Sequence, residues 1–143
     1  MPFWTLARVA RALDVAGQYD DRPVAAISTD TRTLKAGACF VALVGERFDA
    51  HDHLDAAVAA GAAVLVVADA RRAPRAGIPV LEVADTRAAL GQLARYRRDA
   101  WAKPVIGVGG SNGKTSTKEL LKAALGSVFS VHATSGNLNN QIG

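Results

Sequence analysis

The chain has 143 residues, of which 50% are hydrophobic and 21% are charged. This length allows one ordinary domain, or one small domain with part of another, and the apolar content excludes a largely disordered chain. The net charge of +4 permits phosphate-rich partners. The arginines lie in short scattered groups without interleaved aromatic residues, which favours a solvated basic surface and no nucleic-acid partner. No apolar run has the length of a membrane span and the first residues lack the pattern of a secretory signal, so we expect a cytoplasmic protein.

The first hundred residues alternate between short apolar runs and segments of helical periodicity, which is typical of an α/β domain. Strands are predicted from four apolar runs, at 24–27, 39–44, 64–67 and 80–83. The run at 64–67 is apolar throughout, which favours a strand covered on both faces. Cys39 is the single cysteine, so an internal disulfide is excluded, and its apolar surroundings predict a buried core thiol.

Helices are predicted in the same part of the chain from apolar spacing and from a polar residue able to cap the first turn. They lie at 6–13 with Thr5 as the cap, from Asp52 or Asp55 to Ala60, and from Asp85 or Thr86 to Trp101. Together with the strands, these helices predict a small and complete α/β domain.

A second pattern begins after Lys103 and Pro104, because proline disfavours helix at the residue before it. The sequence there predicts a strand at 105–108, a loop at 109–113, a helix at 114–125 and a strand at 128–132. We therefore place a domain boundary near residue 102. The expected fold is α/β, with a small domain at 1–102 and the first β-α-β unit of a P-loop ATPase domain at 103–143. Roughly forty residues are too few for a stable sheet, so the chain is expected to be a fragment.

The loop before the last predicted helix is rich in glycine and ends in Gly113-Lys114-Thr115. A strand, a tight glycine turn and Lys-Thr at a helix start can form a phosphate cradle, because backbone N–H groups converge on the anion and the helix dipole attracts it. Lys114 is predicted to reach the outer phosphates of ATP and Thr115 to hold a phosphate-bound Mg²⁺, which makes both candidate catalytic residues. The candidate nucleotide-binding residues are Gly110, Ser111, Asn112, Gly113, Lys114, Thr115 and Ser116.

The loop departs from the commonest phosphate-loop pattern, because Val108 stands where that pattern has its first glycine. The alternative is a plain glycine-rich turn between a strand and a helix, with Lys114 merely exposed. The order of strand, turn, Lys-Thr and helix favours the phosphate cradle.

Three stretches have to be considered together with this loop. They are Ser28-Thr29-Asp30-Thr31-Arg32, the segment Gly45-Glu46-Arg47-Phe48-Asp49-Ala50-His51, and the ending Gly136-Asn137-Leu138-Asn139-Asn140-Gln141-Ile142-Gly143. With the loop they resemble the Mur ligases, the ATP-dependent amide-bond ligases that build the peptide of bacterial peptidoglycan. The loop fits the family form Gly-x-x-Gly-[Thr/Ser]-Asn-Gly-Lys-[Thr/Ser], except that Gly109 stands just before the fitting residues where threonine is common. ATP binding is expected to survive this difference.

The resemblance implies a fold and a chemistry. Mur ligases have a UDP-substrate domain, a central ATPase domain and a C-terminal amino-acid-binding domain, and this chain would hold the first and the start of the second. ATP would phosphorylate the carboxylate of UDP-N-acetylmuramoyl-tripeptide, and the amine of D-alanyl-D-alanine would then attack the acyl-phosphate. The implied protein is a bacterial cytoplasmic enzyme, monomeric at full length. The chain alone is expected to be inactive, because residues that complete the magnesium site would lie beyond Gly143.

The resemblance also suggests where the UDP-linked substrate lies. The candidate substrate-binding residues are Thr29, Thr31, Gly45, Glu46, Arg47, Phe48, Asn137 and Asn140. Arg47 suits a diphosphate because its planar guanidinium matches phosphate oxygens, with a plain surface charge as the alternative. Phe48 is either a uracil-facing ring or part of the core. Asp30 and Arg32 either contact the ligand or brace their loop by pairing with each other.

Carboxylate and imidazole groups are concentrated just after the Gly-Glu-Arg-Phe stretch. They belong to Asp49, His51, Asp52, His53 and Asp55. Such a group could bind a transition metal. Aspartates also suit a helix N-terminus, where the dipole favours them, and His51 resembles a family turn that is not a metal site. The second interpretation is favoured.

Other function classes remain as alternatives. A related Mur ligase that adds the third peptide residue would share the loop, whereas a folylpolyglutamate-type synthetase fits neither the Asn-Asn-Gln-Ile-Gly ending nor a UDP-type first domain. A non-catalytic UDP-sugar-binding module is a second class. A nucleic-acid-binding P-loop protein is a third, and it would show a steep salt dependence of its affinity.

Overall fold

The computed structural model describes residues 2–135 and divides into two compact units, unit 1 (Met1–Ala100) and unit 2 (Trp101–Gly143). Unit 1 contains a parallel sheet with the strand order β1-β2-β3-β4, in which every strand pairs with the next one along the chain. The strands are β1 (Ile27–Ser28), β2 (Cys39–Val41), β3 (Val64–Val67) and β4 (Val80–Glu82). The predicted α/β class and the four strand positions are therefore confirmed.

Three strands differ from their predicted bounds. The fourth, predicted at 80–83, ends one residue earlier at Glu82, and in the first two another contact replaces the sheet. The first strand was predicted at 24–27 but begins at Ile27, because the N–H of Val24 donates to the carbonyl of Trp4 (2.9 Å). The second was predicted to run to Val44 but ends at Val41, and Val44 instead forms an isolated antiparallel bridge with Asp49. The resulting hairpin lies at the carboxyl edge of the sheet.

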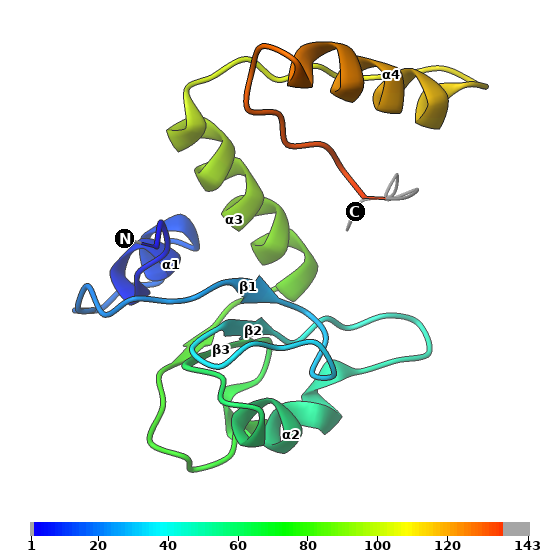
Figure 1. The fold of residues 1–143 in the computed structure, drawn as a ribbon. Coiled ribbons are helices and arrows are strands. Elements are labelled where there is room, and N and C mark those ends of the chain that lie inside the picture. Colours follow the sequence, from blue (N-terminus) through cyan, green and yellow to red (C-terminus); the bar gives the residue numbers. More distant parts are fainter. Residues whose placement is uncertain (1, 136–143) are drawn as a thin grey trace. The chain divides into compact units, whose positions relative to one another are not determined.

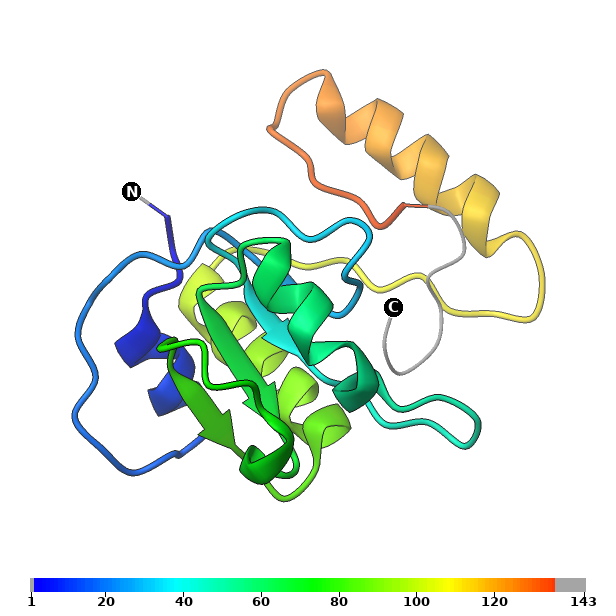
Figure 2. The ribbon, with the colours of Figure 1, turned by 90° about the horizontal axis from the view of Figure 1, so that it is seen from below.

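Helices cover both faces of this sheet (Figures 1 and 2). One face packs against α1 (Leu6–Ala12) and α3 (Thr86–Trp101), and the other packs against α2 (Leu54–Ala59). Residues alternate between the two cores along each strand, as the pleat requires: Cys39 and Val41 join the first core, and Phe40 joins the second. In β3 all four residues are buried, which confirms the prediction of a strand covered on both faces.

The helix starts confirm two predicted caps and correct a third. Thr5 Oγ1 accepts the N–H of Arg8 (3.2 Å) and Asp85 Oδ1 accepts the N–H of Ala88 (3.1 Å). The cap predicted at Asp52 or Asp55 is wrong, because the chain first forms a short 3₁₀ helix at Ala50–His53 whose cap is Asp49. The carboxylate of Asp49 accepts the N–H of His51 (2.9 Å), so the turn begins several residues earlier than predicted.

A recurrent turn supports the loops of unit 1. In each Asp-x-Arg turn, an aspartate Oδ1 accepts the backbone N–H of the arginine two residues later, at 2.7–3.1 Å. The turns are Asp20 with Arg22, Asp30 with Arg32, Asp69 with Arg71, and Asp85 with Arg87. In the first three the guanidinium also binds the carboxylate. A side chain that bonds its own backbone two residues on stabilises a loop locally.

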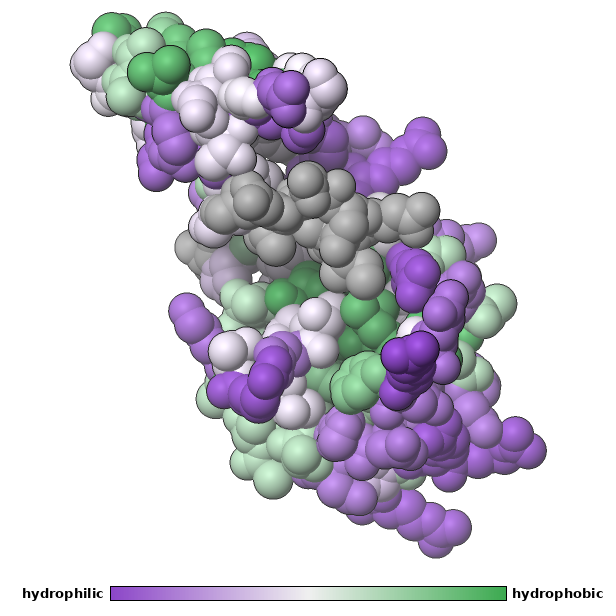
Figure 3. Space-filling view, turned by 90° about the vertical axis from the view of Figure 1, so that its right-hand side faces the viewer, coloured by the Kyte–Doolittle hydropathy of each residue, from purple (hydrophilic) through white to green (hydrophobic). Residues whose placement is uncertain are grey.

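The described part of unit 2, up to residue 135, contains one helix, α4 (Lys114–Gly126), close to the predicted 114–125. The strands predicted at 105–108 and 128–132 are wrong, since the structure has no strand between residues 101 and 135. A strand needs a partner, and the sheet of the described residues is confined to unit 1. Val105, Ile106, Val128 and Phe129 are accordingly 59–76% exposed. Figure 3 shows apolar surface, in green, on the unit that carries α4.

Within residues 2–135, none of the helices combines the length and the apolar character that a bilayer crossing requires.

Candidate functional site

The glycine-rich loop of unit 2 uses glycine where the backbone requires it. Gly110 has φ 143° and Gly113 has φ 74°, both in a region that other residues rarely adopt. A Cβ at Gly113 would meet nothing within 4 Å, so the backbone angle and not crowding favours glycine there. Gly113 is also the residue that precedes α4, and the carbonyl of Gly113 accepts the N–H of Thr117 (2.9 Å). The turn therefore places the first residues of α4 directly after the loop.

The start of α4 has the properties of an anion site. No side chain caps it and its first turn has no acidic residue, as far as residues 2–135 show. The first N–H groups of a helix have no partner inside the helix, and the dipole adds positive potential. Ser111 and Asn112 of the loop and Ser116 of the first turn are exposed, and Thr115 lies beside Lys114. These groups can together surround a phosphate.

Lys114 folds back over this loop. Its Nζ donates to the carbonyl of Gly110 at 2.6 Å. The side chain is half-buried, and the choice between a phosphate cradle and a plain glycine-rich turn stays a prediction. Because the ammonium group already lies over the loop, a phosphate would replace one oxygen acceptor with a charged one, and charge-assisted bonds are the stronger kind.

In unit 1, the candidate residues after β1 lie in a braced loop. The guanidinium of Arg32 binds the carboxylate of Asp30 (Nη2 to Oδ2, 2.7 Å), and Arg32 N–H donates to the same group (2.9 Å). These hydrogen bonds lower the pKa of Asp30 to about 2. Of the two alternatives for Asp30 and Arg32, the structure shows the pairing within the loop. Thr29 and Thr31 flank Asp30 and are half-buried.

The candidate residues after β2 lie at the tip of a hairpin formed by residues 43–50, called here the 43–50 hairpin. Gly45 N–H donates to the carbonyl of Phe48 (2.7 Å) and Ala50 N–H to that of Leu43 (2.9 Å). Glu46 and Arg47 are exposed between them. The tip therefore presents a carboxylate, a guanidinium and an aromatic ring together.

Phe48 belongs to this exposed tip. It is 54% exposed, and its ring stacks on that of His53 with centroids 5.5 Å apart and an interplanar angle of 21°. The alternative that placed Phe48 in the core is therefore wrong, because the hairpin extends beyond the sheet edge. A flat exposed pair of rings is a surface on which a planar group can stack.

A network at the base of the hairpin was missed in part by the sequence analysis. Asp49 Oδ1 lies 2.7 Å from His51 Nδ1, and Asp49 Oδ2 accepts from Arg72 Nη1 (2.6 Å). The hydrogen bond from Arg72 contributes most to holding the pKa of Asp49 well below its usual range. Arg72 also donates to Asp52 (2.6 Å). The aspartates and the histidine were singled out from the sequence, whereas no local pattern pointed to Arg72, which is 23 residues from Asp49.

These contacts also bear on the metal alternative. The carboxylate of Asp49 is already occupied by Arg72 and His51, and Nε2 of His51 accepts the N–H of Ala68 (2.9 Å). Across residues 2–135, no group of three or more metal-ligating side chains has the arrangement of a metal site. Asp49 and His51 thus form hydrogen bonds within unit 1.

The remaining residues singled out from the sequence are two asparagines and the cysteine. Asn137 and Asn140 lie outside the described residues. Cys39 is fully buried, as predicted, and burial raises the pKa of its thiol to about 12. A thiol with so high a pKa is protonated at neutral pH and is a poor nucleophile.

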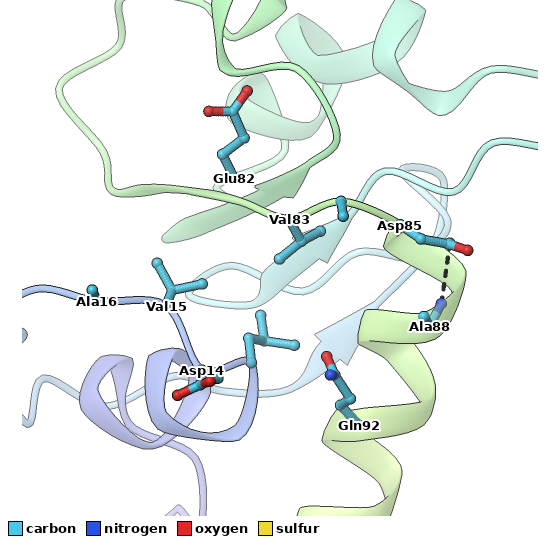
Figure 4. Close-up of a pocket in the computed structure, with 10 residues that line it drawn as sticks. Asp14, Val15, Ala16, Glu82, Val83, Asp85, Ala88 and Gln92 are labelled. Carbon is cyan, nitrogen blue, oxygen red and sulfur yellow. Dashed lines mark hydrogen bonds between the residues drawn. The ribbon is translucent and has the colours of Figure 1, made fainter.

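A cavity of about 510 Å³ lies elsewhere at the carboxyl edge, between the end of α1, the end of β4 and the start of α3 (Figure 4). Its lining residues are Leu13, Asp14, Val15, Ala16, Glu82, Val83, Ala84, Asp85, Ala88 and Gln92. Two of its carboxylates have internal partners: Asp85 caps α3, and Glu82 accepts the N–H of Ala70 (3.0 Å). None of the predicted site residues that the structure describes lines this cavity.

Comparison with known proteins shows the family of this chain. Residues 23–98 match the Mur ligase family, catalytic domain, and residues 108–143 match the Mur ligase middle domain. The first match covers more than half of the chain. The chain therefore belongs to the Mur ligase family.

The names of individual relatives are more specific than the family. The chain is 45% identical over 139 residues to UDP-N-acetylmuramoyl-tripeptide–D-alanyl-D-alanine ligase of Escherichia coli, covering 97% of this chain and 30% of that protein. It is 42% identical to the ligase of the same name from Bacillus subtilis, covering 88% of this chain and 28% of that protein. The chain thus spans about a third or less of the length of these relatives.

Solved structures agree. A crystal structure of MurF from Acinetobacter baumannii superposes with a TM-score of 0.86 at 41% identity, covering 97% of this chain and 31% of that one. The structure of MurF ligase from Thermotoga maritima in complex with ADP has a TM-score of 0.67 at 34% identity, covering 79% of this chain and 26% of that one.

Proposed function

We propose that the chain is part of an ATP-dependent ligase that joins D-alanyl-D-alanine to UDP-N-acetylmuramoyl-tripeptide through an acyl-phosphate. The observation that carries this proposal is the 45% identity to the Escherichia coli enzyme of that name, together with an uncapped helix start behind a glycine turn. Because the chain covers 30% of that relative, the activity is that of a longer protein. The cytoplasmic location and the monomeric state expected from the sequence belong to the same proposal.

In this proposal the two predicted domains bind different ligands. Residues 1–102 would bind the UDP-linked substrate, and residues 103–143 would begin the ATP-binding domain. Support comes from the division into two compact units after Ala100. The two family matches also lie on different sides of this boundary. Each part would hold one of the two anions that the reaction has to bring together.

For ATP, we propose that the N–H groups around Gly113 and the ammonium of Lys114 neutralise the outer phosphates, with Thr115 at a bound Mg²⁺. The residues present fit such a group, because α4 begins without a capping side chain and Lys114 already lies over the loop. Charge neutralisation by fixed donors is what a phosphoryl transfer needs from its protein. The T. maritima structure with ADP supports a nucleotide as the ligand of this fold.

For the UDP-linked substrate, we propose the carboxyl edge of unit 1. Thr29 and Thr31 would offer hydroxyl groups, and the hairpin tip would offer Arg47 to the diphosphate and Phe48 to the uracil. The exposure of the tip and the stacked pair of Phe48 and His53 support this assignment. Ligands of parallel α/β sheets usually bind outside the carboxyl ends of the strands.

The test is calorimetric titration of the chain with UDP-N-acetylmuramoyl-tripeptide, UDP and ATP. We expect both uridine ligands to bind, and Arg47→Ala to weaken their binding about tenfold while ATP binding, if measurable, stays unchanged. Arg75→Ala, which removes another exposed arginine of unit 1, is the control. Retained affinity in Arg47→Ala would overturn the assigned role of the hairpin tip.

The corresponding test of the phosphate loop uses the full-length protein. Lys114→Ala is expected to abolish turnover and to spare binding of the UDP-linked substrate, because the ammonium acts on ATP. Turnover close to that of the unmodified protein would contradict this role. Loss of binding of the UDP-linked substrate in Lys114→Ala would instead contradict the division between the two domains.

A further inference from the structure

The 43–50 hairpin has few contacts that fix its direction. Its two internal hydrogen bonds, from Gly45 and Ala50, join its own strands. Outside the hairpin, Arg87 Nη2 donates to the carbonyl of Val44 at a long 3.5 Å, Leu43 packs against the first core, and the ring of Phe48 stacks on that of His53. The tip residues are exposed. Because His53 lies in the 3₁₀ helix that Asp49 caps, the position of the tip depends largely on what holds Asp49.

Asp49 is held from two directions. On one side, His51 connects it to the end of β3: Oδ1 of Asp49 lies 2.7 Å from His51 Nδ1, and His51 Nε2 accepts the N–H of Ala68 (2.9 Å). On the other side, Oδ2 accepts from Arg72, which follows β3 in the short 3₁₀ helix Ala70–Arg72. The base of the hairpin is thus connected to the neighbouring strand at two points.

The proton position on His51 follows from these partners. The N–H of Ala68 is a donor, so Nε2 must accept, and the ring proton of a neutral imidazole is then on Nδ1, facing Asp49. The side chain of His51 is 1% exposed, so no water replaces a lost partner easily. His51 is therefore an internal part of the base, whereas Arg72 closes it from the surface with a side chain that is 39% exposed.

We propose that Arg72 is a positioning residue: by binding Asp49 and Asp52 with separate nitrogens of one guanidinium, it sets the direction of the 43–50 hairpin and so the affinity for a uridine diphosphate. The binding part of this inference rests on the proposed function. Arg72 acts through Asp49 and is not itself placed against the ligand. The planar fork suits this role, because two carboxylates on the same turn can be held at once, each at 2.6 Å.

The neighbouring residue provides a matched control. Arg71 is also an arginine of the 3₁₀ helix and also pairs with a carboxylate, that of Asp69 (2.9 Å). Its hydrogen bonds are with Asp69 in its own Asp-x-Arg turn, not with the hairpin. Arg71→Ala and Arg72→Ala thus remove the same charge from adjacent positions, and only the second removes a contact to Asp49.

The first readout is amide hydrogen exchange, which does not depend on any ligand. In Arg72→Ala we expect exchange at Gly45 and Ala50 to rise about tenfold, because the hairpin opens more often. In Arg71→Ala we expect a change of less than about twofold. The N–H of Leu65, bonded to the carbonyl of Pro79 at 3.0 Å within the sheet, reports whether the fold is intact. Unchanged exchange at Gly45 and Ala50 with Leu65 protected would overturn the proposal.

The second readout is calorimetric titration of the same variants with UDP. We expect Arg72→Ala to weaken binding about tenfold and Arg71→Ala to leave it unchanged. Faster hairpin exchange with undiminished affinity would also overturn the proposal, because the position of the hairpin would then not matter to the ligand. If the unmodified chain binds no UDP, the proposed function fails, and the exchange measurement separately decides whether Arg72 positions the hairpin.

A third variant covers the case in which the N–H of Leu65 also exchanges faster in Arg72→Ala. Arg72→Lys keeps the charge but replaces the planar fork by one ammonium nitrogen, so it cannot reproduce two bonds from separate nitrogens. We expect its exchange at Gly45 to lie between those of the unmodified chain and Arg72→Ala. Exchange equal to that of the unmodified chain would show that charge alone suffices and would overturn the role of the fork.

Discussion

The two units of this chain use apolar residues in opposite ways. Unit 1 encloses both faces of its sheet, so that Phe40, Leu65 and Leu81 are 0–1% exposed. The part of unit 2 within the described residues has one helix, α4, without a buried residue, and Leu120 on that helix is 71% exposed. Apolar residues thus form a closed core in unit 1 and stay exposed in the described part of unit 2.

The difference comes from what each segment has to pack against. In unit 1 the order of strands and helices supplies a sheet with helices on both of its faces, so each apolar side chain meets another. In unit 2 the predicted strands have no partner strand among residues 101–135, and α4 has no buried residue there. A secondary-structure pattern alone is therefore insufficient for a core.

The largest expected effect contrasts a core residue of unit 1 with an apolar residue of unit 2. Phe40→Ala should destabilise the chain by about 3–5 kcal/mol, because it leaves a cavity between β2 and α2. Leu120→Ala should change stability by less than about 0.5 kcal/mol, because the side chain is already in water. Urea unfolding followed by circular dichroism measures both. Equal effects of the two substitutions would contradict the contrast between the units.

A smaller effect is expected at the start of α4. Gly113→Ala places a Cβ at φ 74°, which costs about 1–2 kcal/mol although no neighbouring atom lies within 4 Å. The N–H of Thr117, which donates to the carbonyl of Gly113, should then exchange faster, while the N–H of Leu65 in unit 1 keeps its rate. Faster exchange at both positions would mean that the two units do not open independently.

The start of α3 in unit 1 provides the counterpart. There Asp85 Oδ1 accepts the N–H groups of Arg87 (2.7 Å) and Ala88 (3.1 Å), as Figure 4 shows for Ala88. Removing this cap in Asp85→Ala should cost about 1 kcal/mol. The measurement is urea unfolding, with Asp55→Ala, an exposed aspartate of α2, as the control. No loss of stability in Asp85→Ala would mean that packing of α3 alone fixes where this helix begins.

Much of unit 1 could be predicted from the sequence, because its signals are local. The apolar run at 64–67 and the caps at Thr5 and Asp85 each depend on neighbouring residues, and the structure bears them out. The strand predicted at 105–108 failed for a non-local reason, since a strand exists through its partners and none is present between residues 101 and 135.

The same distinction holds for the candidate site. The pairing of Asp30 with Arg32 was predictable, because the residues are two apart in one turn. The exposure of Phe48 and the contact of Arg72 with Asp49 were not, since they depend on a hairpin direction and on a contact across 23 residues. The roles of Lys114, Thr115 and Arg47 in binding ligands stay predictions.

The smallest expected effect is a pH dependence that belongs to unit 1, which contains the Asp-x-Arg turns. Hydrogen bonds from Arg71 lower the pKa of Asp69 from its ordinary value of 3.8 to about 2. The folded chain then binds fewer protons at this group than the unfolded chain does, so the stabilisation is complete above 3.8 and is lost as the pH falls toward about 2. The pair is exposed to solvent, so the effect is small and decreases with added salt.

In thermal unfolding between about pH 5 and pH 2, Asp69→Asn should lose less stability on acidification than the unmodified chain. Asp55→Asn, outside these turns, is the control. An equal acid slope for Asp69→Asn and the unmodified chain would show that the turn adds no proton-linked stability.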